Sequence, residues 1–368
     1  MYPVVDGSLC VSCDLCEKSC PSGKISQRPD PQILGGQNRN REIRQVSSSG
    51  GVFTALATNM IRRGGVVFGT VMNDSLTAET VGVFNEEGLA DIRGSKYLQS
   101  LSADAIEAAA ELVGKGVEVL FSGTPCQVAG LYARIGNHPS NLITVDFVCH
   151  GTPSPGVFRA YIKTLETLHG SKVVRFSFRD KRLGWKDFST VAVFENGDTE
   201  SGTQRTDPFL RGFLQNLYLR PSCYACHLRF DKLPADITIA DLWGADMICP
   251  ERDDDTGLSL ILLHSDEGAA YLASCEGLEM FPIPHAEPLR RVNPSLFEPS
   301  VPHRNRSRFF RAYAKEGFSF DRLNRLLAPP GRLERAWERL RHAPAGIARR
   351  LTGRRQEQSI THHFSPKG

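Results

Sequence analysis

The segment VEVLFSGTPCQVAGLYARI, residues 117–135, contains the alternation that decides the fold. A short β-branched and aromatic run, a turn of small residues and a helical apolar pattern follow one another within it. The run LITVDFV, residues 142–148, likewise leads through a turn into the helical pattern FRAYIKTLETLHG, residues 158–170. This strand–turn–helix alternation predicts an α/β (α+β) fold, in which a mixed or parallel sheet is flanked by helices.

Two cysteines stand just past the ends of these strands, where open α/β sheets place their cofactors. They are Cys126 and Cys149, and a Cys-x-x-Cys pair, Cys223 and Cys226, follows in RPSCYACHLRF, residues 220–230. Four thiolates that the fold brings to one point suit an iron–sulfur cluster or zinc. The alternative is that Cys126 and Cys149 are buried thiols and only the pair binds metal.

The N-terminal run CVSCDLCEKSCP, residues 10–21, has the C-x2-C-x2-C-x3-C-P spacing of bacterial ferredoxins with 4Fe–4S clusters. Its cysteines are Cys10, Cys13, Cys16 and Cys20; zinc binding or a structural role is the alternative. In the two-cluster version the fourth cysteine binds the other cluster, and the second cysteine run is absent here. Either the second cysteine run lies upstream of the given sequence, or one half of the module has been lost. In the second case we expect a labile cluster and fewer than about eight irons per chain.

Composition sets outer limits on the protein class. The chain has 368 residues, 40% of them hydrophobic, and ten cysteines without a signal-peptide pattern, which predicts metal ligation in the reducing cytoplasm. The sequence contains no run of about 18 apolar residues, so no membrane span is predicted. From Leu326 onward nine Arg or Lys face three Glu. An apolar stripe there (Leu333, Ala336, Trp337 and Leu340) predicts peripheral membrane or partner contact, or else a helix packed on the body before a disordered end.

Four segments are expected along the chain. Residues 1–30 form a ferredoxin-like motif, and residues 31–45 form a linker because the segment from Arg28 to Arg41 is polar and rich in Pro, Gly and Asn. Residues 46–325 form the main domain, and residues 326–368 form a basic helical or disordered tail.

Three loops carry candidate binding residues. Ser48, Ser49, Gly50 and Gly51 precede a helical pattern, so they predict either a phosphate seat at a helix N-terminus or an ordinary serine N-cap. The loop GSKYLQS, residues 94–100, contains a lysine and a tyrosine. The segment RDKRLGWKDFS, residues 179–189, places cations beside Trp185 in a turn that either stacks on a flat ligand or is simply solvated.

The ordered series SSSGGVF, GSKYLQS, FSGTPCQVAG, CHGTPSP, FRDKRLGW, SCYACH and ITIADLWG resembles the coenzyme F420 hydrogenase/dehydrogenase beta-subunit family. That family includes flavoprotein subunits and a chlorophyll-cycle reductase. The resemblance runs from about Cys10 to Arg291, and the order of the motifs is more specific than any one of them.

The resemblance implies an FAD-binding domain, a 4Fe–4S cluster held by the four core cysteines, and a fused ferredoxin module that holds a possible second cluster. It favours the phosphate seat over the serine N-cap. It also implies flavin contacts from two further segments, whose residues are Lys96, Tyr97, Gly123, Thr124, Pro125 and Gln127. Lys96, Arg179 and Lys181 are candidates to stabilise the reduced ring, and His150 either relays a proton or holds a neighbouring group.

The expected function is to couple a one-electron carrier to a two-electron reaction, because clusters carry single electrons and a flavin can pass on two. The expected partners are ferredoxin or another redox protein and a small-molecule acceptor that the sequence does not identify; no nucleic acid is expected. Two alternatives remain open: a non-catalytic electron-transfer subunit of a larger complex, and a zinc-stabilised binding module.

Overall fold

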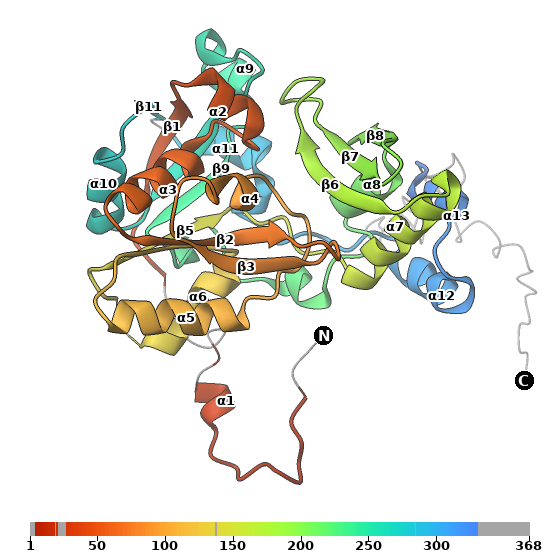
Figure 1. The fold of residues 1–368 in the computed structure, drawn as a ribbon, viewed down its shortest axis with the longest axis horizontal. Coiled ribbons are helices and arrows are strands. Elements are labelled where there is room, and N and C mark those ends of the chain that lie inside the picture. Colours follow the sequence, from red (N-terminus) through yellow and green to blue (C-terminus); the bar gives the residue numbers. More distant parts are fainter. Residues whose placement is uncertain (1–3, 19, 21–26, 137, 284, 330–368) are drawn as a thin grey trace, which may run out of the picture.

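The structure is a computed structural model that describes residues 4–18, 20, 27–136, 138–283 and 285–329. Its body is an eight-stranded mixed sheet with helices on both faces, and a smaller unit built on a three-stranded sheet lies beside it (Figure 1). This arrangement confirms the predicted α/β class. Among the helices that the structure describes, none has the length and apolar character that crossing a membrane requires.

The large sheet has the strand order β11-β1-β10-β9-β5-β4-β2-β3. Strands β2, β4, β5 and β9 are mutually parallel, and the remaining pairings are antiparallel. The carboxyl ends of the parallel strands therefore share one edge, which is where such sheets bind ligands. The strands are β1 (Gln32–Asn38), β2 (Val66–Met72), β3 (Ala78–Val83), β4 (Val119–Ser122), β5 (Leu142–Phe147), β9 (Ile237–Asp241), β10 (Ser259–Leu263) and β11 (Leu278–Pro282).

Helices cover both faces because successive residues of a strand point to opposite sides. Val67 and Leu120 pack with α3 (Val52–Arg62), α4 (Leu89–Ile92) and α10 (Asp266–Ala273). Val119 and Phe121 pack instead with α5 (Ala103–Gly114) and α6 (Pro125–Ile135). Buried apolar side chains on both faces explain why these strands appear in the sequence as continuous apolar runs.

The linker expected over residues 31–45 is wrong, because this segment is strand β1 followed by α2 (Arg41–Val46). Strand β1 lies between β11 and β10 inside the sheet. A Cβ atom at Gly35 would lie 2.2 Å from the Phe281 ring of β11. The glycines that suggested a linker thus allow a bulky neighbour to pack directly on the strand backbone.

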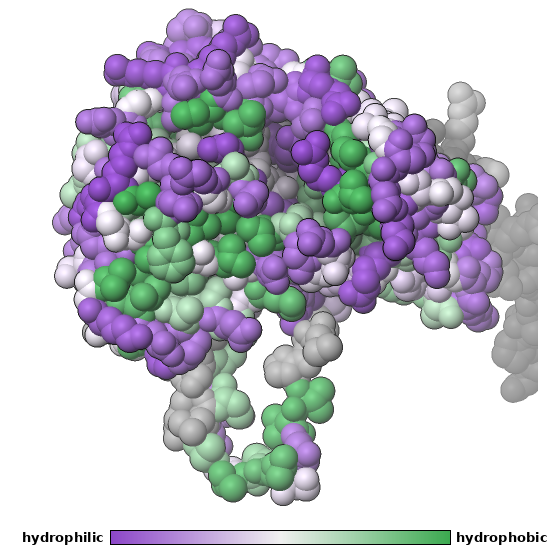
Figure 2. All heavy atoms as spheres, viewed as in Figure 1, coloured by the Kyte–Doolittle hydropathy of each residue, from purple (hydrophilic) through white to green (hydrophobic). Residues whose placement is uncertain are grey.

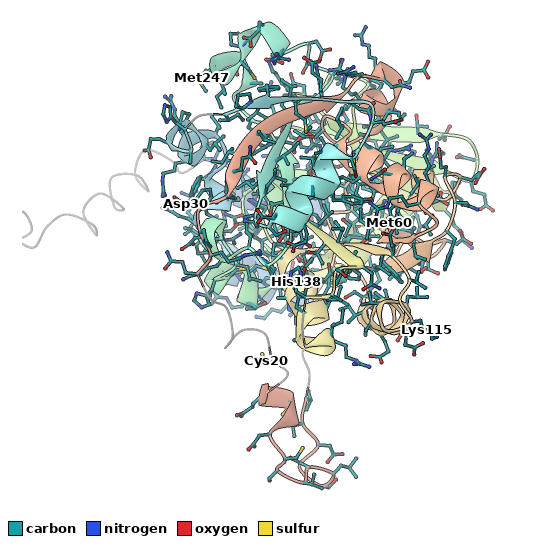
Figure 3. All side chains as sticks on the ribbon, turned by 90° about the vertical axis from the view of Figure 1, so that its left-hand side faces the viewer. Cys20, Asp30, Met60, Lys115, His138 and Met247 are labelled. Atoms are coloured by element: carbon teal, nitrogen blue, oxygen red, sulfur yellow. The ribbon has the colours of Figure 1, made fainter. Side chains whose placement is uncertain are left out.

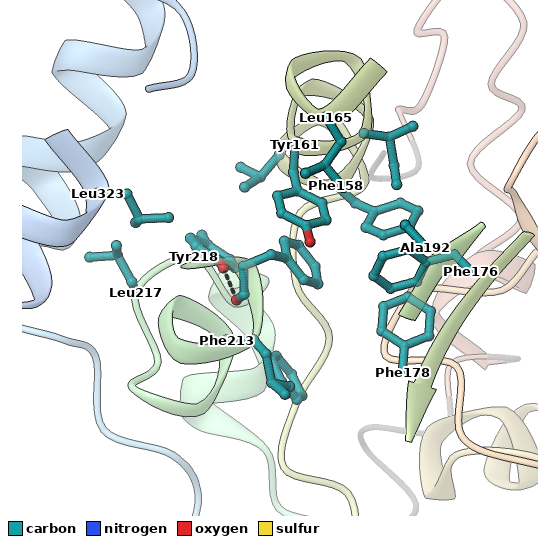
Figure 4. Packing of buried hydrophobic residues seen from close by; sticks show 14 of the residues in the cluster. Phe158, Tyr161, Leu165, Phe176, Phe178, Ala192, Phe213, Leu217, Tyr218 and Leu323 are labelled. Atoms are coloured by element: carbon teal, nitrogen blue, oxygen red, sulfur yellow. Dashed lines mark hydrogen bonds between the residues drawn. The ribbon is translucent and has the colours of Figure 1, made fainter. Parts of the chain in front are cut away.

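The smaller unit is built around an aromatic core (Figure 4). Phe158, Phe176, Phe178 and Phe209 pack with ring centroids 4.8–6.3 Å apart. The elements are α7 (Pro155–His169), β6 (Val173–Asp180), β7 (Ser189–Phe194), β8 (Thr199–Thr203), α8 (Pro208–Leu214), α12 (Arg306–Glu316) and α13 (Phe320–Leu327). The expected tail boundary at residue 326 falls inside α13, whose leucines are part of this core. The predicted stripe at residues 333–340 lies outside the described residues.

The ferredoxin-like run lies on an arm that stands away from the body and contains α1 (Leu15–Lys18) (Figures 1 and 3). Exposed apolar residues lie along this arm (Figure 2), namely Val4, Val5, Leu9 and Val11. Where the arm joins the body, the Arg28 guanidinium donates to four backbone carbonyls, those of Leu233, Pro234, Ala235 and His264. Arg28 thereby fastens the start of the body to the segment that leads into β9.

Short helices complete the described chain. They are α9 (Ala245–Ile248), α11 (Glu287–Val292) and the 3-10 helices η2 (Pro221–Ala225), η3 (Phe230–Lys232), η4 (Pro250–Arg252) and η5 (Pro294–Leu296).

Candidate cofactor site

The fold brings the four core cysteines to one region. Cys126 lies in the first turn of α6, Cys149 follows β5, and Cys223 lies in η2, whose C-cap residue is Cys226. A Cβ at Gly151, where φ is +130°, would lie 3.2 Å from the Cβ of Cys223, so the loop after Cys149 runs against the Cys-x-x-Cys turn. The amide of Thr152 also donates to the Cys223 thiol at 3.4 Å.

The thiols influence one another's protonation. Burial raises the pKa of Cys149 to about 12, and the nearby Cys126 and Cys223 thiols raise it further. Cys126 is exposed at the surface, yet desolvation by the surrounding protein atoms raises the pKa of its thiol, with smaller contributions from Cys226 and Cys223. The Arg229 guanidinium opposes the shift at Cys149 and donates to its carbonyl oxygen at 2.9 Å. Neutral thiols of this kind become thiolates only when a strong cationic centre replaces their protons.

The donor set fits an iron–sulfur cluster, because four thiols converge and an arginine stands beside them to offset the negative charge of a thiolate-bound centre. No three His, Cys, Asp or Glu among the described residues are placed to hold a single metal ion. The N-terminal Cys10, Cys13, Cys16 and Cys20 are all exposed on the arm, and their role as ligands stays a prediction.

A cavity of about 540 Å³ lies at the carboxyl edge of the parallel strands, between the large sheet and the smaller unit. This volume is within the usual range for cofactor sites. Both Cys149 and His150 line its wall, so the cavity and the cysteine cluster share a boundary. Of the predicted contact residues, those that also line the cavity are Ser48, Ser49, Gly51, Lys96, Tyr97, Thr124, Gln127 and Arg179.

The serine–glycine loop meets α3 at this cavity. The N-cap of α3 is Gly51, with φ +79°, and no side chain caps the helix, so the serine N-cap alternative is wrong. A Cβ at Gly50 would lie 2.7 Å from the Gly36 carbonyl and 2.8 Å from the Ser259 amide, so glycine allows the loop to pack on β1 and β10. Uncapped N–H groups at the start of an 11-residue helix suit a phosphate.

The turn before α6 faces the cavity and the thiols at once. Thr124 and Gln127 form a capping box, in which the Thr124 amide donates to Gln127 Oε1 at 2.8 Å. The Gln127 amide nitrogen donates to Ser100 Oγ, and the Thr124 hydroxyl lies 3.2 Å from the Cys126 sulfur. Gly123 and Pro125 shape this turn without lining the cavity. The hydrogen bonds of the capping box therefore fix both a wall of the cavity and the position of Cys126, a candidate cluster ligand.

Among the predicted cations, Lys96 lines the cavity and has an N–H group that its backbone acceptors do not use. Its ammonium donates to the carbonyls of Asp91 and Arg93, both at 2.8 Å, which leaves one of its three N–H groups for a ligand. Burial lowers the pKa of Lys96 to about 7. Any anion placed beside it would raise that pKa again and hold the side chain in its charged form.

We therefore expect Lys96→Ala to weaken retention of an anionic cofactor by about tenfold or more, the effect of losing a charged hydrogen bond of about 1.5–3 kcal/mol. Because the charged form dominates only below pH 7, wild-type affinity should fall as the pH rises through about 7. The variant should lose this pH dependence. Cofactor titration from pH 6 to 9, with the exposed Lys115→Ala as control, measures both effects; equal affinities and pH profiles would return Lys96 to an ordinary loop residue.

Arg179 lies in the cavity wall as expected, but its charge has a partner. It forms a bidentate ion pair with Asp241, in which its two terminal nitrogens lie 2.7 and 3.0 Å from the carboxylate oxygens. It also donates to the Ser48 carbonyl at 3.0 Å. It also donates to the Tyr97 hydroxyl at 3.4 Å. Burial alone would lower the pKa of Arg179, but the Asp241 carboxylate outweighs it and raises the pKa. Arg179 therefore joins three walls of the cavity rather than presenting a free cation.

Lys181 is not among the residues that line the cavity. Its ammonium donates to the carbonyls of Arg44, Ser49 and Thr256 at 2.7–2.8 Å. Burial lowers its pKa to about 7, yet three carbonyl acceptors match the three N–H donors of the charged form, so the geometry favours the ammonium. Lys181 supports the serine–glycine loop from behind.

His150 lines the cavity beside Cys149. Its Nδ1 lies 3.4 Å from Ser295 Oγ, and its buried Nε2 has no hydrogen-bond partner among the described residues. Burial lowers its pKa, which keeps the ring neutral at pH 7. A neutral imidazole can accept or pass a proton, so the relay and the supporting role both remain predictions.

Sequence reasoning missed several cavity residues, among them Asp241, Trp243, Ser100 and Phe213. Asp241 ends β9, at the same sheet edge as the cysteines, and accepts a hydrogen bond from Trp185 Nε1 at 2.7 Å. The Trp185 and Trp243 rings stack with centroids 4.9 Å apart. The strand-end position that singled out Cys126 and Cys149 would have found Asp241 too.

Comparison with known protein families identifies the family of this chain. Residues 33–107 match the N-terminal part, and residues 116–283 the C-terminal part, of the family described as "Coenzyme F420 hydrogenase/dehydrogenase, beta subunit". Together the two matches cover more than half of the chain. The chain belongs to this family. It is therefore a redox protein similar to coenzyme F420 hydrogenase/dehydrogenase beta subunits.

A solved structure supports the fold of this beta-subunit relative. A chain of the F420-reducing [NiFe] hydrogenase complex from Methanosarcina barkeri, studied by xenon derivatization, is similar with a TM-score of 0.50 and 18% sequence identity. The similarity covers 73% of the present chain and 88% of the other. No curated protein sequence matches the chain.

Proposed function

We propose that this beta-subunit relative is an iron–sulfur flavoprotein oxidoreductase that passes electrons between a one-electron donor such as ferredoxin and a two-electron small-molecule acceptor. FAD would occupy the cavity, and Cys126, Cys149, Cys223 and Cys226 would hold a 4Fe–4S cluster. The observation that carries the proposal is that Cys149 is shared by the two sites. It is one of the four neighbouring thiols, and it also lines the cavity. A cluster and a flavin would then be separated by little more than one loop.

Each group of residues has a task in this proposal. The N-terminus of α3 and the loop around Gly51 bind the diphosphate, and Lys96 supplies a cation near the flavin. The Arg179–Asp241 pair and the capping box hold the walls at fixed distances. When bound, the flavin supplies the conversion between single electrons and a two-electron transfer. His150 would give or take the accompanying proton.

The test is anaerobic purification followed by cofactor extraction, iron and sulfide analysis and zinc analysis. The expected result is FAD, with about four irons in the core and a less stable additional signal from the arm. A colourless preparation with stoichiometric zinc would refute the flavoprotein and support the zinc-stabilised module. Turnover of a small acceptor by the isolated chain would separate a complete enzyme from a subunit that works only when docked to its complex.

A further inference from the structure

Asn293 has a buried side-chain amide that the fold does not use. The residue is only 5% exposed, and its amide nitrogen Nδ2 has no hydrogen-bond partner among the described residues. Asn293 is the N-cap residue of η5, yet its side chain makes no capping hydrogen bond there. A buried amide without a partner destabilises a protein, because it has lost its hydrogen bonds to water and gained none in return. Its presence is therefore better explained by a ligand than by the folding of the chain.

Asn293 lines the cavity of about 540 Å³ that the proposed function assigns to FAD. Its neighbours Val292, Pro294 and Ser295 line the cavity too, so residues 292–295 form a continuous part of the wall, called here the η5 wall. This wall lies beyond residue 283, where the match to the family ends. An unpaired amide in a cavity wall is the arrangement expected where a ligand supplies the missing partner.

Hydrogen bonds tie the η5 wall to the loop that carries Cys149. Nη1 of Arg229 donates to the Cys149 carbonyl at 2.9 Å and to the Ser295 carbonyl at 3.0 Å. The Ser295 hydroxyl also lies 3.4 Å from Nδ1 of His150, the residue after Cys149. Two residues of chain span at most about 7 Å, so Asn293 lies in the part of the wall next to the candidate cluster. The redox ring belongs on this side, because electrons must pass between it and the cluster.

A flat aromatic side chain adjoins the same wall. Trp243 lines the cavity, and the Trp185 ring stacks on it with centroids 4.9 Å apart and planes at 7°. A Cβ at Gly244 would lie 2.6 Å from Val292 Cγ1, so the chain just after Trp243 touches the η5 wall. An amide has one donating and one accepting side. Beside an aromatic ring, it complements a flat heterocycle that has an N–H next to a carbonyl along one edge.

We propose that Asn293 binds the imide edge of the flavin ring through its side-chain amide. The amide nitrogen would supply a donor for a ring carbonyl, and the amide oxygen an acceptor for the ring N–H. The inference rests on the proposed function, because it assumes a flavin in the cavity. It divides the work of recognition: the N-terminus of α3 binds the diphosphate, and Asn293 binds the ring.

The test measures binding of FAD and of ADP to the full chain after anaerobic removal of its flavin. Asn293→Leu removes the amide at similar volume and should weaken FAD binding at least about tenfold. The affinity for ADP should not change, because ADP has the diphosphate and the adenine but no flavin ring. Without flavin, the variant should unfold at the wild-type temperature or above it, since an unpaired buried amide has been removed.

Asn141→Leu is the matched control, because the Asn141 amide is used by the fold. Its Nδ2 donates to the carbonyls of Val113 and Val117 at 3.0 and 2.8 Å, and the residue precedes β5, at the opposite end of that strand from Cys149. This variant should show the reverse pattern, a lower unfolding temperature with unchanged affinity for FAD. If Asn293→Leu binds FAD as tightly as wild type does, the proposal is overturned whatever the stability of the variant.

N3-methyl-FAD gives a second measurement, because its methyl group replaces the ring N–H. The wild-type chain should bind it at least about tenfold more weakly than FAD, whereas Asn293→Leu should bind the two about equally. Equal wild-type affinities for FAD and N3-methyl-FAD would refute the assignment of Asn293 even if Asn293→Leu does not fold. A wild-type chain that binds no FAD at all would instead refute the proposed function.

Discussion

Cys226→Ser is expected to remove the core cluster and to lower the free energy of unfolding by more than about 4 kcal/mol, the range reached by loss of a metal centre. Cys226 is the C-cap residue of η2, and its thiol lies close enough to Cys126 to raise the pKa of that thiol. Without the cluster, the turn from Pro221 to Cys226 loses the link that joins it to α6 and to the loop after β5. Iron analysis and thermal unfolding of the anaerobic protein measure the two effects.

Cys275→Ser is the matched control for this prediction. Cys275 is buried, whereas Cys226 is half-buried. Cys275 lies away from the four thiols and donates to the Tyr271 carbonyl at 3.3 Å, which a serine hydroxyl can also do. This variant should keep its iron and nearly all of its stability. Should Cys226→Ser retain iron and melt with the wild type, the four-cysteine site would have to be abandoned.

The fold class and the positions of Cys126 and Cys149 at the strand ends could be predicted because both depend on local order in the sequence. Cys126 and Cys149 follow apolar strands, and the carboxyl ends of parallel strands meet at one edge whatever the rest of the chain does. Strand β1 could not be found in this way. Its QILGGQN sequence is interrupted by glycine where Phe281 of a distant strand fills the space above Gly35.

The roles of the cations were harder to predict than their presence. Arg179 and Lys181 are two residues apart in one basic segment, and the sequence pattern does not distinguish which of them contacts a ligand. In the structure Arg179 meets Asp241, which is 62 residues away, and Lys181 meets three backbone carbonyls. Such long-range pairings depend on how the smaller unit packs against the sheet, and no local pattern records that packing.

Asp241→Asn tests the pairing directly, since it removes one charge and keeps the shape of the side chain. The Arg179 side chain is only 4% exposed, so the substitution leaves a buried guanidinium without a counter-charge. Breaking a buried ion pair in this way costs about 3–5 kcal/mol. We expect a loss of stability of that size in chemical denaturation, together with lower FAD retention, because Arg179 also holds the Ser48 carbonyl and the Tyr97 hydroxyl.

The double variant Arg179→Met, Asp241→Asn separates the two effects. Removing the orphaned charge should recover part of the stability lost in Asp241→Asn, because an uncompensated buried charge costs more than the absence of the pair. Retention of FAD should remain low, since the contacts that join the serine–glycine loop to the smaller unit are still missing. Asp180→Asn, which breaks the partly exposed pair with Arg182, should cost less than about 1 kcal/mol. A double variant no more stable than Asp241→Asn would show that the Asp241 carboxylate does little to stabilise the buried Arg179 charge. That charge would then be available to act on the flavin.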